Sequence, residues 1–162
     1  MYRKMRRFKQ ELPAEETVKI FEGGSYGVLA VTGDEGFPYA VPLSYVYADG
    51  KLYFHGAMQG HKMDAIANNE KASFCVVGQD RVVPEAFTTL FSSAVAFGKA
   101  RVVEDDAEKL QALRLFSKKY FSANEEIKNN EEIDRDWSRV CVLALDIEHM
   151  TGKASMEIIN GK

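Results

Sequence analysis

The stretch G-A-M-Q-G-H-K, residues 56–62, holds the residue types best suited to chemistry. A glycine-rich turn that opens a helix is a common phosphate site, because free N–H groups and the helix dipole attract negative charge. The spacing does not fit a nucleoside triphosphatase loop, which places four residues between its glycines and ends in Gly-Lys and Ser/Thr. Here three residues separate Gly56 from Gly60, and His61 precedes Lys62. What remains is another kind of anion site, or a turn without a ligand.

Two potentially cationic side chains, His61 and Lys62, stand at the start of a predicted helix over residues 62–69. This is the positive end of the helix dipole, where a cation costs from a few tenths to about 1 kcal/mol. An anion shared by Lys62 and the free N–H groups would remove that cost. The alternative is that both side chains turn into water.

His55 is the candidate catalytic residue, because it ends an apolar strand pattern and imidazole exchanges a proton near neutral pH. A hydrogen-bonded structural histidine is the alternative, for His55 and equally for His149. The histidines lack the spacing of a zinc site, and no metal is predicted. Cys75 and Cys141 lie in apolar strand patterns and are predicted to be buried free thiols.

A second unusual segment is P-Y-A-V-P-L-S-Y-V-Y, residues 38–47, which places two prolines inside a strand pattern. Proline cannot donate to a ladder, so the segment is predicted to be an edge strand or a locally broken one. Main-chain groups of Val41, Leu43 and Ser44 would then be free to bind a planar ligand. The alternative is an edge protected against aggregation.

The elements that must position these residues are mainly strands. Period-2 patterns and turn residues predict six strands, and 3.6-residue periodicity predicts three helices. Gly98, inside the fifth strand, predicts a bulge or barrel corner. Residues 80–90 are predicted to be a loop or broken strand, and residues 122–136 a polar helical or irregular segment. The strands are predicted over 25–32, 37–47, 51–57, 71–78, 91–104 and 139–150, and the helices over 13–21, 62–69 and 105–121.

Strict strand–helix alternation is missing, so the fold is predicted to be mainly β with appended helices: a small antiparallel barrel in one domain, residues 1–162. The net charge of −3 argues against a dedicated nucleic-acid binder. The basic start M-Y-R-K-M-R-R-F-K-Q is either solvated or touches a phosphate or anionic surface. With no secretory signal and no long apolar run, a cytoplasmic location without membrane insertion is expected.

Several motifs in order resemble one family. They are P-Y-A-V-P-L-S-Y, a D-G turn, L-Y-F-H-G-A-x-x-G-x-K, a later A-F-G-K-A strand and a late T-G-K-A-S. Together they resemble the FMN-binding split-barrel proteins related to pyridoxamine 5′-phosphate oxidase, and within these the nitroimidazole-resistance branch. The resemblance covers nearly the whole chain. It departs at Gly56, where the branch often has serine, which removes one hydroxyl contact.

The resemblance implies a homodimer of six-stranded antiparallel split β-barrels with two flavin sites at the interface. It implies cofactor-binding roles along the flavin ring and near the phosphate, with Lys62 on the phosphate and His61 beside it. Thr151 and Gly152 precede Lys153 in the late motif and would also approach the site. The implied cofactor-binding residues are Pro42, Leu43, Ser44, His55, Ala57, His61, Lys62, Ser92, Ser93 and Lys153.

The function expected from this resemblance is an FMN-dependent oxidoreductase. NAD(P)H would supply electrons, and a small electron-poor compound such as a nitroaromatic would accept them. Pyridoxamine phosphate oxidation is an alternative, although no basic cluster for a second phosphate stands near the C-terminus. A non-enzymatic flavin- or haem-binding protein, or a barrel with no cofactor, is a further alternative.

Overall fold

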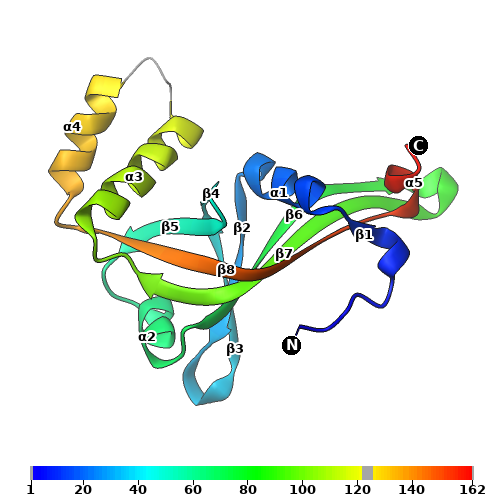
Figure 1. Cartoon of the computed structure of the whole chain (residues 1–162), viewed down its shortest axis with the longest axis horizontal. Coiled ribbons are helices and arrows are strands. Elements are labelled where there is room, and N and C mark those ends of the chain that lie inside the picture. Colours follow the sequence, from blue (N-terminus) through cyan, green and yellow to red (C-terminus); the bar gives the residue numbers. More distant parts are fainter. Residues whose placement is uncertain (1, 122–125, 162) are drawn as a thin grey trace.

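An antiparallel sheet forms the body of the protein (Figure 1). The computed structural model describes residues 2–121 and 126–161. The sheet has eight strands in the order β3-β2-β6-β7-β8-β5-β4, and β1 pairs separately with β8. The strands are β1 Glu11–Leu12, β2 Tyr26–Thr32, β3 Pro38–Ser44, β4 Val46–Ala48, β5 Lys51–Ala57, β6 Lys71–Val83, β7 Thr88–Val102 and β8 Val140–Ala154.

Five α-helices lie around the sheet: α1 Ala14–Gly23, α2 His61–Asn68, α3 Asp106–Tyr120, α4 Glu126–Asp136 and α5 Met156–Ile159. Short 3-10 turns occur at Phe8–Gln10, Asp34–Gly36 and Pro84–Ala86. In the described part of the chain, no helix is long and apolar enough to cross a membrane.

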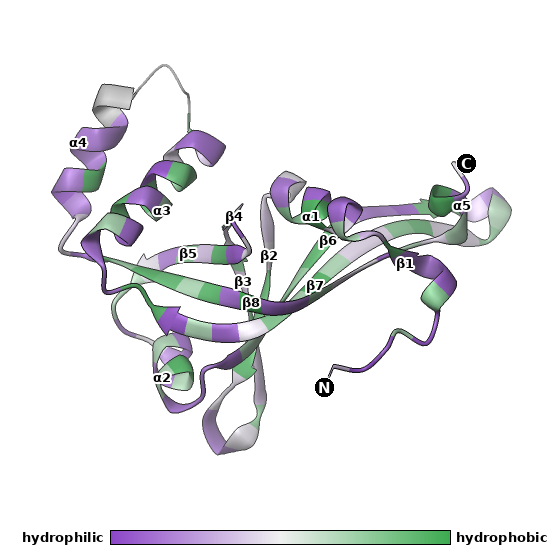
Figure 2. Cartoon of the chain, in the orientation of Figure 1, coloured by the Kyte–Doolittle hydropathy of each residue, from purple (hydrophilic) through white to green (hydrophobic). Residues whose placement is uncertain are grey.

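The barrel core forms because the sheet curls until both of its halves share one interior. Leu29 and Phe74 from one half belong to the same buried cluster as Leu52 and Leu143 from the other. Phe21 of α1 enters this cluster, as do Ala65 and Ile66 of α2, so helices cover the openings of the barrel. Figure 2 shows the hydrophobic stretches running along the strands, whereas α4 is largely hydrophilic. The expected split-barrel class is confirmed, with an open sheet rather than a closed one.

Two features raise the strand number from the predicted six to eight. Glu11–Leu12 pairs with β8, and the predicted strand 37–47 divides at Tyr45 into β3 and β4. Tyr45 is fully buried, and its main chain hydrogen-bonds with α3. Its N–H donates to the Tyr120 hydroxyl at 3.0 Å, and its carbonyl accepts from Lys119 Nζ at 3.0 Å. These partners come from 75 residues away, so the local pattern could not reveal the division.

Helix α3 packs on the outer face of β4, β5 and β8 and builds a second, smaller core. Val46, Tyr53 and Val142 meet Phe116 of α3 and Ile133 of α4 there. The helix begins at Asp105, whose carboxylate accepts from the Glu108 N–H at 2.7 Å, and it ends with lysines in its last turn. Both ends therefore suit the helix dipole.

The segment 80–90, predicted to be a loop or broken strand, is instead part of a long hairpin. Strand β6 continues to Val83, the turn Pro84–Ala86 follows, and Phe87 adopts a left-handed conformation before β7. The polar segment 122–136 contains α4, and its residues 122–125 lie outside the described residues. Strand β8 continues past its predicted end to Ala154, because β7 and β1 supply partners there.

Gly98 marks a bulge, as predicted: the β7–β8 register shifts between Phe97 and Gly98. A Cβ at Gly98 would overlap the carbonyl oxygen of Asp146. Because that oxygen belongs to the facing main chain, Gly98→Ala is expected to lower the free energy of unfolding by about 1–3 kcal/mol, measured by urea titration. Gly23→Ala is the control, since nothing lies within 4 Å of its Cβ; an equal loss in both variants would contradict the explanation.

An ion-pair network joins α3 to the sheet at Glu108. Its carboxylate accepts from Arg101 at 2.8 and 3.0 Å, from Tyr53 Oη at 3.0 Å and from Lys51 at 3.3 Å, while Arg101 also reaches Asp146 at 2.7 Å. The hydrogen bonds from Arg101 are the main reason that the pKa of Glu108 falls to about 2. A carboxyl with a depressed folded-state pKa stabilises the fold above its unfolded pKa and loses that contribution as the pH falls.

Acid unfolding should therefore depend on Glu108. Glu108→Gln is expected to destabilise the protein by about 1–3 kcal/mol at pH 7, because it leaves Arg101 with one carboxylate. The gap between wild type and variant should close as the pH falls from about 4.5 toward about 2. Urea titrations at stepped pH values measure this. Glu16→Gln removes an exposed acid paired with Lys19 and should change stability little; a pH-independent gap for Glu108→Gln would refute the assignment.

Candidate functional site

The turn between β5 and α2 gathers donors that have no acceptor. Gly60 enters the helix with a φ of 130°, a conformation that favours glycine. Its carbonyl accepts from the N–H groups of Met63 and Asp64. The N–H groups of His61 and Lys62 have no partner among the described residues. The turn therefore presents free main-chain donors at the positive end of a helix.

The Lys62 amine lies in this same turn, against the end of β5. A Cβ placed on Gly56 would stand 3.4 Å from Lys62 Nζ, so the amine occupies the space beside that glycine. Lys62 is half-buried and forms no ion pair within the described part of the chain. A half-buried cation without an acid, next to free N–H groups, can bind an anion.

His61 has protein partners of its own. Its ring stacks on Tyr39 with centroids 4.1 Å apart, and its Nε2 lies 3.7 Å from an Asp34 carboxylate oxygen. Both residues belong to the β2–β3 hairpin and its turn. The His61 side chain thus holds α2 against the hairpin, and only its main-chain N–H is free to face a ligand.

The proline strand β3 is an edge strand, as predicted, but it is not broken. It pairs with β2 along its whole length, from Tyr26↔Ser44 to Thr32↔Pro38. The side chains of Pro42 and Ser44 are exposed on the outer face, whereas Leu43 packs on the barrel core. Pro42 and Ser44 can therefore meet a ligand with their side chains, and Leu43 only with its main chain.

His55 faces away from Lys62, on the outer side of β5. Its ring contacts the Phe116 ring edge-on, with centroids 4.6 Å apart. It lines a cavity of about 430 Å³ between β5, α3 and α4, whose floor is apolar and whose rim carries Asn129, Glu132 and Asp136. Burial lowers the pKa of His55 below its ordinary value, so the imidazole is neutral at pH 7. Ala57 is exposed at the end of β5, where it pairs with Val140 of β8.

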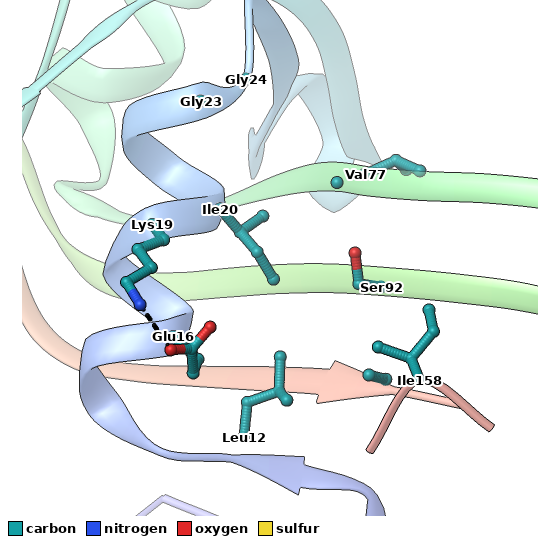
Figure 3. Close-up of a pocket in the computed structure, with 11 residues that line it drawn as sticks. Leu12, Glu16, Lys19, Ile20, Gly23, Gly24, Val77, Ser92 and Ile158 are labelled. Atoms are coloured by element: carbon teal, nitrogen blue, oxygen red, sulfur yellow. Dashed lines mark hydrogen bonds and ion pairs between the residues drawn. The ribbon is translucent and has the colours of Figure 1, made fainter. Parts of the chain in front are cut away.

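Ser92, Ser93 and Lys153 lie far from this turn. Gly56 pairs with Cys141 at the start of β8, while Ser93 pairs with Lys153 at its other end. That separation is roughly 40 Å along the strand. Ser92 points into a different hollow, of about 330 Å³, between Ile20 of α1 and Ile158 of α5, with the Glu16–Lys19 ion pair at its rim (Figure 3).

Apart from the β3 residues, a single chain thus holds the predicted site residues in two groups at opposite ends of β8. The first group, at the end of β5 and the start of α2, is His55, Ala57, His61 and Lys62; the second is Ser92, Ser93 and Lys153. Pro42, Leu43 and Ser44 lie on β3, where Ser44 pairs with Tyr26. Thr151 and Gly152 accompany the second group, opposite Val95 and Ala94.

The outer sheet face between these groups is apolar, a feature that the sequence motifs did not predict. Tyr26 is 65% exposed and Val77 is 62% exposed. Tyr26 pairs with Ser44 and Val77 pairs with Ser93, so both serines lie on this face. The segment Y-G-V-L-A-V-T places apolar residues on both faces of its strand, and this pattern could have identified the apolar outer face. Such a patch marks a surface that another molecule covers.

The cysteines take no part in these groups. Both are free; Cys141 is buried and Cys75 half-buried, and burial raises the pKa of each thiol. Across residues 2–121 and 126–161, no three His, Cys, Asp or Glu side chains gather as a metal site would require.

Solved structures share this fold. A candidate 5-nitroimidazole antibiotic resistance protein from Bacteroides thetaiotaomicron superposes with a TM-score of 0.75 at 24% identity, covering 89% of this chain and 86% of its own. An FAD-binding protein from Mesorhizobium loti gives 0.65 at 24% identity, with 90% and 97% covered. A flavocytochrome from Azotobacter vinelandii gives 0.76 at 19% identity, with 94% and 72% covered. At these identities the likeness establishes the fold alone.

No protein of curated function matches the sequence significantly. The family model described as pyridoxamine 5′-phosphate oxidase matches residues 13–154. That range runs from the start of α1 to the end of β8 and includes both groups of site residues. The chain therefore belongs to the pyridoxamine 5′-phosphate oxidase family.

Proposed function

We propose that two copies of this chain bind FMN between them and act as an oxidoreductase, taking electrons from NAD(P)H and passing them to a small electron-poor acceptor such as a nitroaromatic. The observation that carries the proposal is the Lys62 amine beside the free N–H groups of the α2 turn. Two proteins of similar structure, an FAD-binding protein and a flavocytochrome, support a flavin as the ligand.

The donor set of the α2 turn fits a flavin phosphate. A phosphate monoester carries roughly two negative charges near neutral pH. Lys62 offsets one, and the N–H groups of His61 and Lys62 supply hydrogen bonds at the positive helix end. The exposed edge of β3 nearby, with Pro42 and Ser44, offers a flat surface for the ring system.

Pairing of two copies accounts for the separation of the site residues. Ser93 and Lys153 are too far from Lys62 to join it within one chain. The exposed apolar face that carries Ser44 and Ser93 needs a cover. A two-fold related copy would cover that face and bring its own second group toward the first. The interface would then create the flavin site.

When bound, the flavin supplies the electron transfer, and the protein supplies binding, orientation and proton handling. His55, neutral at pH 7, can accept a proton at one ring nitrogen and donate one from the other. Its cavity has an apolar floor from Leu113, Phe116 and Ile133, which excludes water from a small aromatic acceptor. The structural similarity to the candidate 5-nitroimidazole antibiotic resistance protein from B. thetaiotaomicron supports the nitroaromatic class.

Lys62→Ala is expected to weaken FMN binding by about 10- to 100-fold, because a charge-assisted hydrogen bond contributes roughly 1.5–3 kcal/mol. Quenching of flavin fluorescence during titration measures the Kd. Lys118→Ala removes an exposed lysine in the last turn of α3 and should leave the Kd unchanged. Equal FMN affinity in wild type and Lys62→Ala would reject the phosphate assignment.

The absorbance spectrum of purified protein separates the alternatives. Two broad visible bands support a flavin, and chromatography of the released cofactor distinguishes FMN from FAD. A Soret band would indicate haem instead. A colourless protein that does not take up FMN or FAD would refute the proposal. Turnover of pyridoxamine 5′-phosphate, without reduction of any nitroaromatic, would favour the alternative oxidase.

His55→Ala is expected to lower kcat by at least about 100-fold while changing the FMN Kd less than twofold, because general acid–base groups contribute roughly 10²–10⁴. Since burial lowers the pKa of His55, the wild-type rate should be flat near neutral pH and fall only below pH 6.5. The variant should lose this acid limb. Ser117→Ala, on the same cavity wall, is the control; a wild-type pH profile in His55→Ala would exclude the proton role.

A further inference from the structure

The N-terminal arm, residues 2–10, concentrates positive charge that the rest of the chain does not neutralise. It contains Arg3, Lys4, Arg6, Arg7 and Lys9, although the whole protein has a net charge of −3. Among the described residues, none of these five forms an ion pair. Unpaired cations held on one short segment create a local positive field that attracts anions.

Specific contacts hold this arm along the distal end of β8. Strand β1 pairs Glu11 with Lys153, at the second group of site residues. Tyr2 Oη donates to the Glu148 carboxylate at 2.6 Å, and the Tyr2 ring stacks on His149 with centroids 4.6 Å apart. Phe97 lies 5.7 Å from Tyr2, centroid to centroid. The arm is thus fixed by an aromatic cluster on the outer sheet face.

A hollow of about 440 Å³ lies between the arm and β8. Its walls include the cations Arg3 and Lys4, the rings of Tyr2, Phe8 and His149, and the Glu11 carboxylate. On the other side of Phe8, a second hollow is lined by Arg6, Arg7 and Lys9. Gln10 lines it too; this residue is only 9% exposed, and its buried Oε1 has no hydrogen-bond partner. The hollow between the arm and β8 thus combines two cations, aromatic rings and one acidic residue.

We propose that the arm and the end of β8 bind the adenosine diphosphate portion of a nicotinamide dinucleotide. Arg3 and Lys4 would contact the phosphates, an aromatic ring would stack on the adenine, and Glu11 would accept from a ribose hydroxyl. This inference rests on the proposed function, in which NAD(P)H supplies the electrons. The arm lies at the second group of site residues, because Glu11 pairs with Lys153. A nucleic acid fits less well, because the cations are confined to one arm of an acidic protein.

Calorimetric titration of the full chain with ADP-ribose tests the site without any flavin. The double variant Arg3→Ala/Lys4→Ala is expected to raise the Kd at least about tenfold. The control Arg114→Ala/Lys118→Ala removes the same charge from the exposed side of α3 and should bind as wild type. No ADP-ribose binding by the wild type, equal affinity in both double variants, or binding of single-stranded DNA or anionic vesicles in its place would overturn the proposal.

Steady-state kinetics extends the test to the electron donor. The KM for NADH or NADPH should rise about tenfold in Arg3→Ala/Lys4→Ala with kcat within twofold, since the arm binds but does not react. The KM of the wild type should also rise with salt. If dithionite-reduced protein passes electrons to a nitroaromatic while neither dinucleotide reduces it, the flavin and the acceptor of the proposed function survive, but its NAD(P)H donor and this inference fail. If the protein binds ADP-ribose but no flavin, this inference survives and the proposed function fails.

Discussion

Strand β8 is the constraint on which the rest of the structure depends, because it pairs with β5, β7 and β1 along its length. Its first half is buried on both faces. Leu143 and Leu145 enter the barrel core, while Val142 and Ala144 face α3. A strand with two apolar faces cannot stay at a surface, so the barrel and the α3–α4 pair must enclose it from both sides. The α3–α4 pair does not cover the sheet completely at the end of β5, and the cavity at His55 lies there.

The second half of β8 extends beyond the barrel and carries the late T-G-K motif with it. Its length therefore separates residues that a flavin site would need together. Under the proposed function, association with a second copy would complete the site. The exposed Tyr26 and Val77 and the distant Lys153 are consequences of the same long ladder. The register of β7 on β8, adjusted at the Gly98 bulge, decides which of their residues would face a second copy.

Local patterns predicted what depends on local chemistry. The spacing of Leu113 and Phe116 identified α3, and two prolines identified β3 as an edge strand. Contacts between distant segments were not predictable. Tyr45 interrupts a strand because Tyr120 and Lys119 of α3 bond its main chain. His61 has a partner because a hairpin places Tyr39 above it. The sequence motifs named the candidate site residues. Only the register of the strands showed that Lys62 and Lys153 lie near different ends of β8.

Gly56 links the anion site of the α2 turn to the candidate catalytic residue His55. The related branch often has serine at this position, and its loss removes a neutral hydroxyl donor. In this chain Lys62 Nζ approaches the place where a side chain at position 56 would begin, so glycine leaves room for the amine. An ammonium adds a full positive charge to its hydrogen bond with a phosphate oxygen, which a neutral hydroxyl does not. The substitution therefore strengthens the α2 turn as an anion site, and it places that charge one residue from His55, on the opposite face of β5.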